Sequence, residues 1–516
     1  MTVFMFSICA FMCAGFQAKT FFNPPEVIQA GSKDYQGVDT RQFQGISSLA
    51  VSDSGRLWAT WYGGPTPGED KNNYVILSTS GDGGKSWREK FIVDPDGAGD
   101  IRAFDPEIWL DPDGRLWLFW AQHPASDHLN PHSGVWAMRN DNPDREAGKW
   151  SSPRRLTEGI MMCKPTVLSG GKWLLPASTW RNTDYSARAV ASDNNGLSFE
   201  VAGACNVLPV EERAFDEHMF VERRDGSIWM LVRTRYGIGE SVSRDKGATW
   251  SEFKPSAIKH PSARFFIRRL NSGNLLLVKH GPIDEQTGRS HLMAFISKDD
   301  GKTWLGGLLL DERAGVSYPD GQQTADGTIY VTYDYSRTGE KKIHMATFTE
   351  EDALAGKPRS GKVRQRVIIS EGTPAKPDKN QDGKPLAKKP AAAISGGQDS
   401  FRFDKGAKLF SDRSYQATKV PEALEGAQCL RVNMDGNKSV QCRKSGMVHF
   451  LTPKPNRNKD SQAEHLEKQG FERVALPEIP LFNQKPTSFC TLYQKKCEQG
   501  EQIRFGKWAV PILLNQ

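Results

Sequence analysis

The chain has 516 residues, of which 38% are hydrophobic and 25% charged, values typical of soluble globular proteins rather than of membrane or disordered chains. Its formal net charge is +7, but the stretch from Gly356 to Pro390 holds ten basic and three acidic residues and therefore carries all of that excess. The remainder of the chain has no net charge, which argues against a nucleic-acid-binding protein.

The first eighteen residues contain no charged side chain and are rich in Phe, Met, Ala and Cys. This composition predicts a signal peptide over residues 1–18 and a secreted or periplasmic protein, although no basic residue precedes the apolar run and the large Phe16 occupies the −3 position. No other segment is long and apolar enough for a membrane span, so no stable span is expected.

A motif of the form Ser-x-Asp-x-Gly-x-Ser/Thr-aromatic occurs four times, with Asn in place of Asp in the second copy, at residues 80–87, 192–199, 243–250 and 297–304. The starts are 112, 51 and 54 residues apart, and a degenerate copy between Met138 and Trp150 fills the long first interval. Gly suits a left-handed turn, and Ser and Asp side chains bind the turn backbone, so the motif predicts a structural hairpin turn. The alternative, a calcium loop, would need more acidic ligands than each copy has.

A second repeat, a glycine turn that leads into an apolar strand, occurs six times between the copies of the first. Its glycines are 59, 57, 55, 47 and 54 residues apart, at Gly55, Gly114, Gly171, Gly226, Gly273 and Gly327. This interval is the length of a four-stranded antiparallel sheet with its turns. The two repeats predict an all-β protein with a six-bladed β-propeller over residues 19–370.

The remaining sequence predicts a Lys/Pro-rich linker over residues 371–395 and a small β-rich domain over residues 396–516, suited to binding glycans or to packing on the propeller. Four cysteines of the last domain favour disulfides if the protein is exported, with Cys163 and Cys205 as a third pair, and their connectivity is open. The spacing of the cysteines does not match a zinc site.

The first repeat resembles the Asp-box, or BNR repeat, of the sialidase superfamily, and the resemblance extends from about Asn23 to Ser370. It implies a propeller enzyme that acts on glycans, with three arginines for a substrate carboxylate, a Tyr nucleophile activated by Glu, and an Asp as acid/base. Because Asp-boxes also occur in propellers with other activities, the resemblance indicates the fold more strongly than the reaction.

Four residues of the later blades resemble the sialidase set in chain order. Glu217, a glycine turn and Arg233 at the end of the next strand are similar to the segment that carries the activating Glu and one carboxylate-binding Arg. Arg289 resembles the next such Arg, and Tyr318 resembles the nucleophile. The resemblance therefore implies Tyr318 and Glu217 as catalytic residues and the two arginines as substrate-binding residues.

The first blade departs from the resemblance. Where sialidases have an aromatic-Arg-Ile-Pro segment, this chain has Phe43-Gln44-Gly-Ile-Ser, so we interpret Gln44 as the replacement of the first arginine. Arg41 is a nearby substitute, three residues earlier and so displaced by about 10 Å along a strand. The acid/base loop offers two acidic residues, Glu69 and Asp70. These departures leave a uronate or a neutral sugar open beside sialic acid.

Three hypotheses follow, all with a glycan as the partner. The first is a sialidase-like exo-glycoside hydrolase that cleaves a terminal acidic sugar. The second is a polysaccharide lyase or another glycan-active enzyme, for which a His next to the site, such as His218, would help to remove a proton or bind substrate. The third is a propeller that binds glycans without catalysis. The sequence contains no nucleotide loop and no HExxH metal motif, so no cofactor and no metal are expected.

Overall fold

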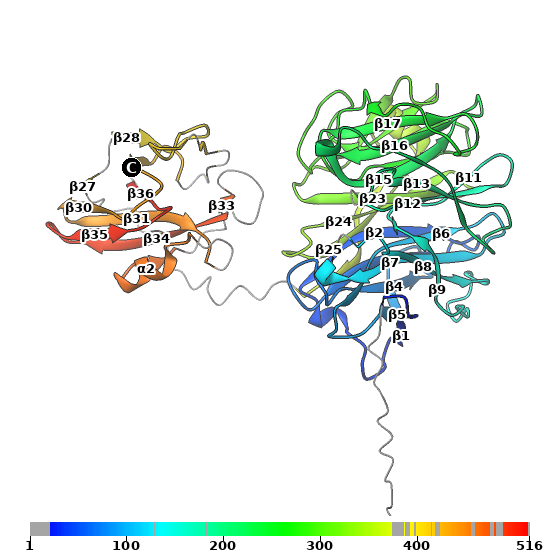
Figure 1. The fold of residues 1–516 in the computed structure, drawn as a ribbon, viewed down its shortest axis with the longest axis horizontal. Coiled ribbons are helices and arrows are strands. Elements are labelled where there is room, and N and C mark those ends of the chain that lie inside the picture. Colours follow the sequence, from blue (N-terminus) through cyan, green and yellow to red (C-terminus); the bar gives the residue numbers. More distant parts are fainter. Residues whose placement is uncertain are drawn as a thin grey trace, which may run out of the picture. The chain divides into compact units, whose positions relative to one another are not determined.

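The computed structural model describes residues 21–513 except 128–129, 181–182, 374–385, 387–392, 397–398, 414, 418–419, 421–423, 456–459, 475–478 and 481–488. The chain forms two compact units, Met1–Ala375 and Lys376–Gln516, which are described separately (Figure 1). The predicted signal peptide and most of the predicted linker lie outside the described residues. Within the described residues no helix is long and apolar enough to cross a membrane.

The first unit is a six-bladed β-propeller, as the repeats predict. Each blade is an antiparallel sheet of consecutive strands, and the extra strand β1 (Glu26–Gln29) lies outside β5 in the first. Blades one to three contain β2 (Phe43–Val51), β3 (Leu57–Gly64), β4 (Tyr74–Ser80) and β5 (Arg88–Asp94); β6 (Ile101–Leu110), β7 (Leu116–Pro124), β8 (Gly134–Asn140) and β9 (Arg154–Glu158); and β10 (Ile160–Met161), β11 (Thr166–Val167), β12 (Trp173–Ser178), β13 (Ala187–Ser192) and β14 (Glu200–Cys205).

Blades four to six contain β15 (Arg213–Glu222), β16 (Ile228–Thr234), β17 (Gly237–Ser243) and β18 (Lys254–Pro255); β19 (Phe266–Arg269), β20 (Leu275–His280), β21 (Leu292–Ser297) and β22 (Leu305–Asp311); and β23 (Val316–Gln323), β24 (Thr328–Tyr335), β25 (Lys342–Thr349) and β26 (Arg364–Glu371). A short helix, α1 (Glu350–Ala355), connects the last two strands. Short 3₁₀ turns cover Val38–Thr40, Ala125–Asp127 and Val210–Glu212.

The Asp-boxes connect the third and fourth strands of their blades. In the first box Ser80 Oγ donates to Asp82 Oδ1 at 2.7 Å and accepts from Gly84 N at 3.0 Å, while Asp82 Oδ1 accepts from Ser86 N at 3.0 Å. The boxes that begin at Ser243 and Ser297 repeat these bonds. The structural interpretation of the motif is therefore confirmed, and the boxes lie at the end of each blade that also carries the glycine turns.

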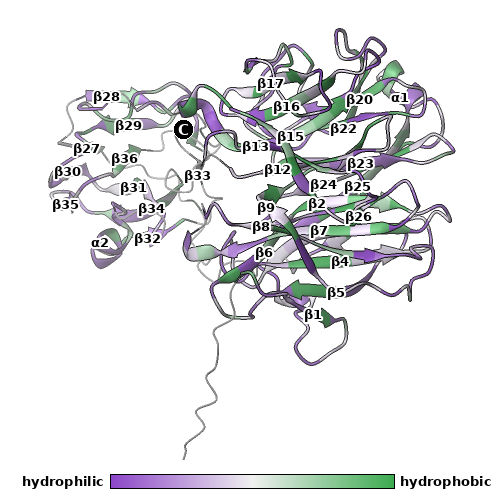
Figure 2. Cartoon of the chain, turned by 45° about the vertical axis from the view of Figure 1, so that its right-hand side comes forward, coloured by the Kyte–Doolittle hydropathy of each residue, from purple (hydrophilic) through white to green (hydrophobic). Residues whose placement is uncertain are grey.

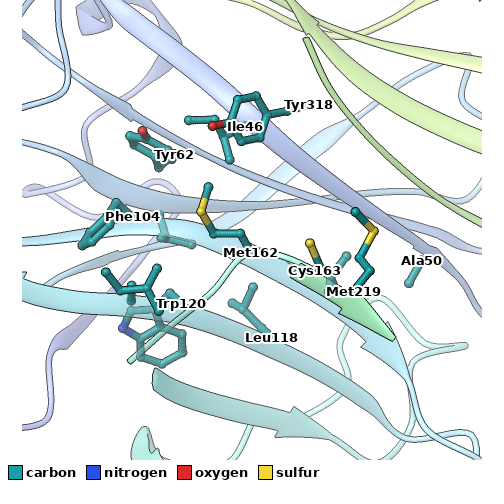
Figure 3. Packing of buried hydrophobic residues seen from close by; sticks show 14 of the residues in the cluster. Ile46, Ala50, Tyr62, Phe104, Leu118, Trp120, Met162, Cys163, Met219 and Tyr318 are labelled. Carbon is teal, nitrogen blue, oxygen red and sulfur yellow. The ribbon is translucent and has the colours of Figure 1, made fainter. Parts of the chain in front are cut away.

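The propeller core gathers around the first strands of the blades. One apolar cluster includes side chains from the innermost segment of every blade, among them Ile46, Ile108, Met162, Met219, Ile267 and Tyr318. Figure 3 shows Tyr318, Ile46 and Met219 among the packed side chains of this cluster. Apolar residues follow the strands, and the connecting loops are mostly hydrophilic (Figure 2). Each blade is thus anchored to the same core, and its loops are free to carry polar groups.

Side chains close the ring between the last blade and the first. Gln322 on β23 accepts from Val51 N at 3.0 Å and donates to Val51 O at 2.9 Å, so it pairs with the backbone of β2 as a strand would. Asp320 accepts from Ser48 Oγ at 2.7 Å and from Leu49 N at 3.1 Å. This closure brings residues from the two ends of the propeller sequence into contact beside the axis.

The C-terminal unit is β-rich, and its strands form two sheets. They are β27 (Ala393–Ser395), β30 (Lys438–Lys444) and β35 (Gln502–Phe505) in one, and β28 (Asp399–Arg402), β29 (Gln428–Arg431), β31 (Gly446–Pro453), β32 (Glu472–Arg473), β33 (Ile479–Pro480), β34 (Phe489–Cys497) and β36 (Val510–Leu513) in the other, with helix α2 (Ala463–Lys468). Its described cysteines, Cys429, Cys442, Cys490 and Cys497, are buried, as are Cys163 and Cys205 of the propeller, and none of these six is joined to another by a disulfide. The expectation of disulfide support is wrong for these six residues, and apolar burial of the thiols replaces it.

Candidate active site

Four of the six first strands carry a bulge in which one residue that is not glycine adopts a left-handed conformation. These residues are Ile46 (φ 58°), Asp105 (φ 49°), Asp216 (φ 51°) and Tyr318 (φ 52°). Such a conformation costs about 1–3 kcal/mol for a residue with a side chain and is concentrated at functional sites. A bulge also turns a side chain away from the direction that regular pleating would give it. Several blades therefore use the same strained bulge to orient a side chain near the propeller axis.

Tyr318, Glu217 and Arg233 form a triangle of hydrogen bonds. The hydroxyl of Tyr318 donates to Glu217 Oε1 at 3.0 Å, and Nη1 of Arg233 lies 2.7 Å from the same oxygen and 2.9 Å from the Tyr318 hydroxyl. All three side chains are at least nine-tenths buried, and they come from blades four and six. The structure thus brings together three of the residues that the sequence predicted for the site.

The triangle holds a protonated phenol beside a base that can take its proton. Burial first, and the Glu217 carboxylate second, raise the pKa of the Tyr318 hydroxyl above its usual value. A neighbouring carboxylate that already accepts the phenol hydrogen is placed to act as its base. Arg233 donates to both oxygens and so stabilises the negative charge on whichever of them carries it.

Three further guanidinium groups surround the ring of Tyr318. Their carbon atoms lie 4.5 Å from the ring centroid for Arg337, 5.6 Å for Arg264 and 5.7 Å for Arg289. Arg289 donates to Ser317 Oγ at 3.1 Å and to Ser262 O at 3.2 Å, and among the described residues it forms no ion pair. Burial lowers the pKa of Arg289. A partly buried cation without a carboxylate partner is suited to binding an anionic ligand.

The loop between β3 and β4, which the resemblance predicts to carry the acid/base residue, places its two carboxylates differently. Glu69 is 45% exposed and lies 3.4 Å from Nη1 of Arg337, the group that covers the Tyr318 ring. Asp70 accepts hydrogen bonds from the backbone and side chain of Asn72 at 2.8 and 3.1 Å, within its own loop. The geometry favours Glu69 as the carboxyl group that faces the site and gives Asp70 the role of holding the loop.

A model of the BNR repeat-like domain matches residues 55–331, which is more than half of the chain. The chain belongs to the BNR repeat-like family. Among solved structures, the intramolecular trans-sialidase from Ruminococcus gnavus is similar over 64% of this chain and 98% of its own, at 14% identity and a TM-score of 0.50. A leech intramolecular trans-sialidase is similar over 65% of this chain and 71% of its own, at 15% identity and a TM-score of 0.50. No curated protein matches the chain in sequence. At these identities the structural matches support the sialidase-like propeller fold.

In this BNR propeller two of the predicted substrate-binding residues lie elsewhere. Arg41 is fully buried, pairs with Glu89 of β5 at 2.5 and 2.8 Å, and also donates to Gln36 O. The prediction that Arg41 binds substrate is therefore wrong, because its guanidinium is fixed at the outer strand of the first blade. Gln44 is also occupied away from the site, since its amide donates to Lys341 O of the last blade and accepts from Trp61 Nε1 at 3.1 Å.

His218 is the second residue for which the predicted role in substrate binding does not fit the structure. Its ring nitrogens lie 3.0 Å from Asp216 O and 2.8 Å from Arg188 O, and it packs against Phe220. Burial lowers its pKa to about 4, so the ring is neutral at physiological pH. Because successive strand residues point to opposite faces, His218 turns into the space between blades when Glu217 faces the site. His218 is a structural residue of the BNR propeller.

Asp105 is a residue of the site region that the sequence prediction missed. It is buried at the left-handed position of β6, and burial, followed by the charge of Glu69, raises its pKa well above the usual range. A signal for it was available: Asp105-Pro-Glu107 repeats the pattern of Tyr318-Pro-Asp320, one blade presenting a carboxyl group where the other presents the phenol.

Next to these residues is a buried network of two acidic and two basic side chains, Glu107, Asp320, Arg264 and Lys164. Arg264 lies 3.0 Å from Glu107 and 3.6 Å from Asp320, and Lys164 lies 2.7 Å from Asp320 and 3.8 Å from Glu107. The Ser48 hydroxyl lies 2.8 Å from Glu107 Oε2 and 2.7 Å from Asp320 Oδ2, so its one proton bridges the two carboxyl groups. Glu107 and Asp320 each follow a left-handed bulge residue by two positions, so the network ties the bulges that present Asp105 and Tyr318 to one another.

Proposed function

We propose that this protein is a retaining exo-glycosidase that removes a terminal acidic sugar, with sialic acid as the first candidate, from glycans outside the cytoplasm. The observation that carries the proposal is the buried triangle of Tyr318, Glu217 and Arg233. A carboxylate nucleophile would be repelled by a sugar whose anomeric carbon bears a carboxylate, whereas a phenol paired with a base would not. Arg233 and Arg289 supply guanidinium groups for that substrate carboxylate.

The reaction proceeds in two steps. In the first, the Tyr318 oxygen attacks the anomeric carbon while Glu217 takes the phenol proton, and the glycosidic bond breaks as Glu69 protonates the leaving oxygen. In the second, water attacks the same carbon and gives a proton to Glu69, and the glycosyl–tyrosine bond breaks as the proton on Glu217 returns to the phenol oxygen. The product is a free sugar with retained configuration, and the enzyme regains its starting state.

The experiment that tests this proposal is a comparison of substrates with the purified protein. Methylumbelliferyl glycosides of sialic acid, glucuronic acid and rhamnose are incubated in parallel with polyuronates, and released umbelliferone, reducing sugar and ultraviolet absorbance are measured together. We expect release from the sialoside without new absorbance. Absorbance from an unsaturated uronate would identify a lyase instead, and binding without turnover of any glycan would contradict catalysis.

Substitution of the acid/base candidates is expected to separate Glu69 from Asp70. The Glu69→Gln variant should cleave a sialyl-galactoside about 10²–10⁴-fold more slowly, because its leaving oxygen needs a proton. Its loss on the umbelliferyl sialoside should be much smaller, since that leaving group departs as an anion. Steady-state kinetics on both substrates measure the difference. The matched Asp70→Asn variant should stay within a few-fold of the wild type, and a larger loss there would assign the acid to Asp70.

A further inference from the structure

Arg337 reaches the site along a path that depends on a glycine of another blade. It lies in the loop between β24 and β25, and its backbone carbonyl accepts from Gln44 N at 3.1 Å. The side chain crosses Gly45 of β2 so closely that a Cβ atom at Gly45 would lie 2.7–2.9 Å from Cδ, Cγ and Nε of Arg337. A side chain at position 45 and an arginine at position 337 would therefore compete for the same space.

The guanidinium of Arg337 is held on one side and free on the other. Nε donates to Asp334 Oδ2 at 2.9 Å, and Nη1 lies 3.4 Å from Glu69. Nη2 is buried, and it donates no hydrogen bond to any residue that the structure describes. Of the three guanidiniums over the Tyr318 ring, Arg337 is the closest, at 4.5 Å from the centroid. A buried donor without a partner beside the proposed nucleophile is suited to an acceptor oxygen that the ligand brings.

We propose that Arg337 is a specificity-determining residue, which completes the subsite for the substrate carboxylate together with Arg233 and Arg289. This inference rests on the proposed function. Blade six supplies the guanidinium from its loop, and the first strand of blade one supplies only the space, through Gly45. In the aromatic-Arg-Ile pattern of the sialidases the arginine directly precedes the isoleucine, and in this chain Gly45 directly precedes Ile46. In this proposal Gly45, rather than Gln44, takes the position of the replaced arginine.

Asp334 holds Arg337 and the bulge of β2 in place. Its Oδ2 accepts from Nε of Arg337 and, at 2.7 Å, from the backbone N–H of Ile46, the left-handed residue of β2. One buried carboxylate thus fixes both the bulge that follows Gly45 and the arginine that lies over it. The guanidinium is preorganised before substrate binds, which reduces the entropy lost on binding.

The first test compares an acid with its uncharged derivative. Affinities for N-acetylneuraminic acid and for its methyl ester are measured by titration calorimetry on the wild type, Arg337→Met and Arg337→Lys. Because Arg337→Met removes a charged hydrogen bond to the carboxylate, it should bind the acid about 10–100-fold more weakly than the wild type. Its affinity for the ester should be almost unchanged. Arg337→Lys, which keeps the charge, should have an affinity for the acid between those of the wild type and Arg337→Met. The control is Arg244→Met, because Arg244 is 78% exposed in an Asp-box and should leave both affinities as they are.

The second test moves the arginine back to the first blade. Gly45→Arg alone should lose acid binding, because the new side chain collides with Arg337, and the double variant Gly45→Arg/Arg337→Gly should recover it in part. If Arg337→Met keeps the wild-type preference for acid over ester while Arg289→Met loses it, the role of Arg337 is overturned and the proposed function stands. If the wild type shows no preference for the acid and no turnover of sialosides, the proposed function fails with it.

Discussion

The Tyr318→Phe variant is expected to cleave an umbelliferyl sialoside about 10³-fold more slowly than the wild type, or worse, while its affinity for the free acid stays within a few-fold. The substitution removes only the oxygen that attacks the anomeric carbon, and it leaves the ring that packs between Ile46 and the guanidiniums. The left-handed backbone should be unchanged, because Phe and Tyr have the same groups at Cβ and therefore the same steric cost in this conformation. Steady-state kinetics and calorimetric titration with N-acetylneuraminic acid measure the two effects separately.

The matched control for this variant is Tyr333→Phe. Tyr333 is fully buried in the same blade, and its hydroxyl donates to Asp311 at 3.1 Å, away from the Tyr318 triangle. Loss of that hydrogen bond should lower stability by about 1 kcal/mol and leave kcat unchanged. Equal losses of activity in the two variants, or activity of Tyr318→Phe within a few-fold of the wild type, would contradict a nucleophilic role for Tyr318.

The Arg264→Leu variant is expected to lose about 3–5 kcal/mol of unfolding free energy in the propeller. Arg264 is 1% exposed and lies against both Glu107 and Asp320, so its removal leaves two buried carboxylates with Lys164 as their remaining cation. The two cations only just compensate the two buried carboxylates, because burial and the charge of Asp320 already raise the pKa of the Glu107 carboxyl. Adding Glu107→Gln to Arg264→Leu should recover part of the loss, since it removes one orphaned charge.

Tryptophan fluorescence in a denaturant titration measures this loss in the propeller. Of the 14 tryptophans, all but Trp508 precede residue 375, so the signal reports the first unit and hardly the second. The exposed Arg244→Leu variant should stay within about 0.5 kcal/mol of the wild type. A loss for Arg264→Leu no larger than that of Arg244→Leu would show that the buried network does not stabilise the blades.

The sequence was sufficient for the fold because a propeller repeats its turn chemistry. Each Asp-box needs Ser, Asp and Gly at fixed positions to satisfy its own backbone, so the spacing of the boxes gives the blade length directly. Glu217, Arg233 and Tyr318 came from the resemblance to the sialidases, which the repeats alone do not supply. Adjacency in the chain misled for His218, because the residue next to Glu217 lies on the opposite face of the strand.

Contacts across the closure of the ring could not be predicted in this way. Arg337 and Gly45 are far apart in the chain, and only the packing of β24 against β2 brings them together. Arg41 illustrates the reverse error, since its closeness to Gln44 in sequence suggested a role that its ion pair with Glu89 prevents. The bulges of β6 and β23 left a trace in the repeated x-Pro-acid pattern of Asp105 and Tyr318, but their left-handed conformation is visible only in the structure.

The most direct test of the account is to trap the glycosyl–enzyme with a 3-fluorosialosyl fluoride and to locate the label by mass spectrometry of peptides. Fluorine next to the anomeric carbon slows both steps, and the fluoride leaving group restores the first, so the covalent intermediate accumulates. We expect one sugar attached to the peptide that contains Tyr318, and no label in Tyr318→Phe. A label on another residue, or turnover of the reagent by wild-type protein with no label at all, would contradict it.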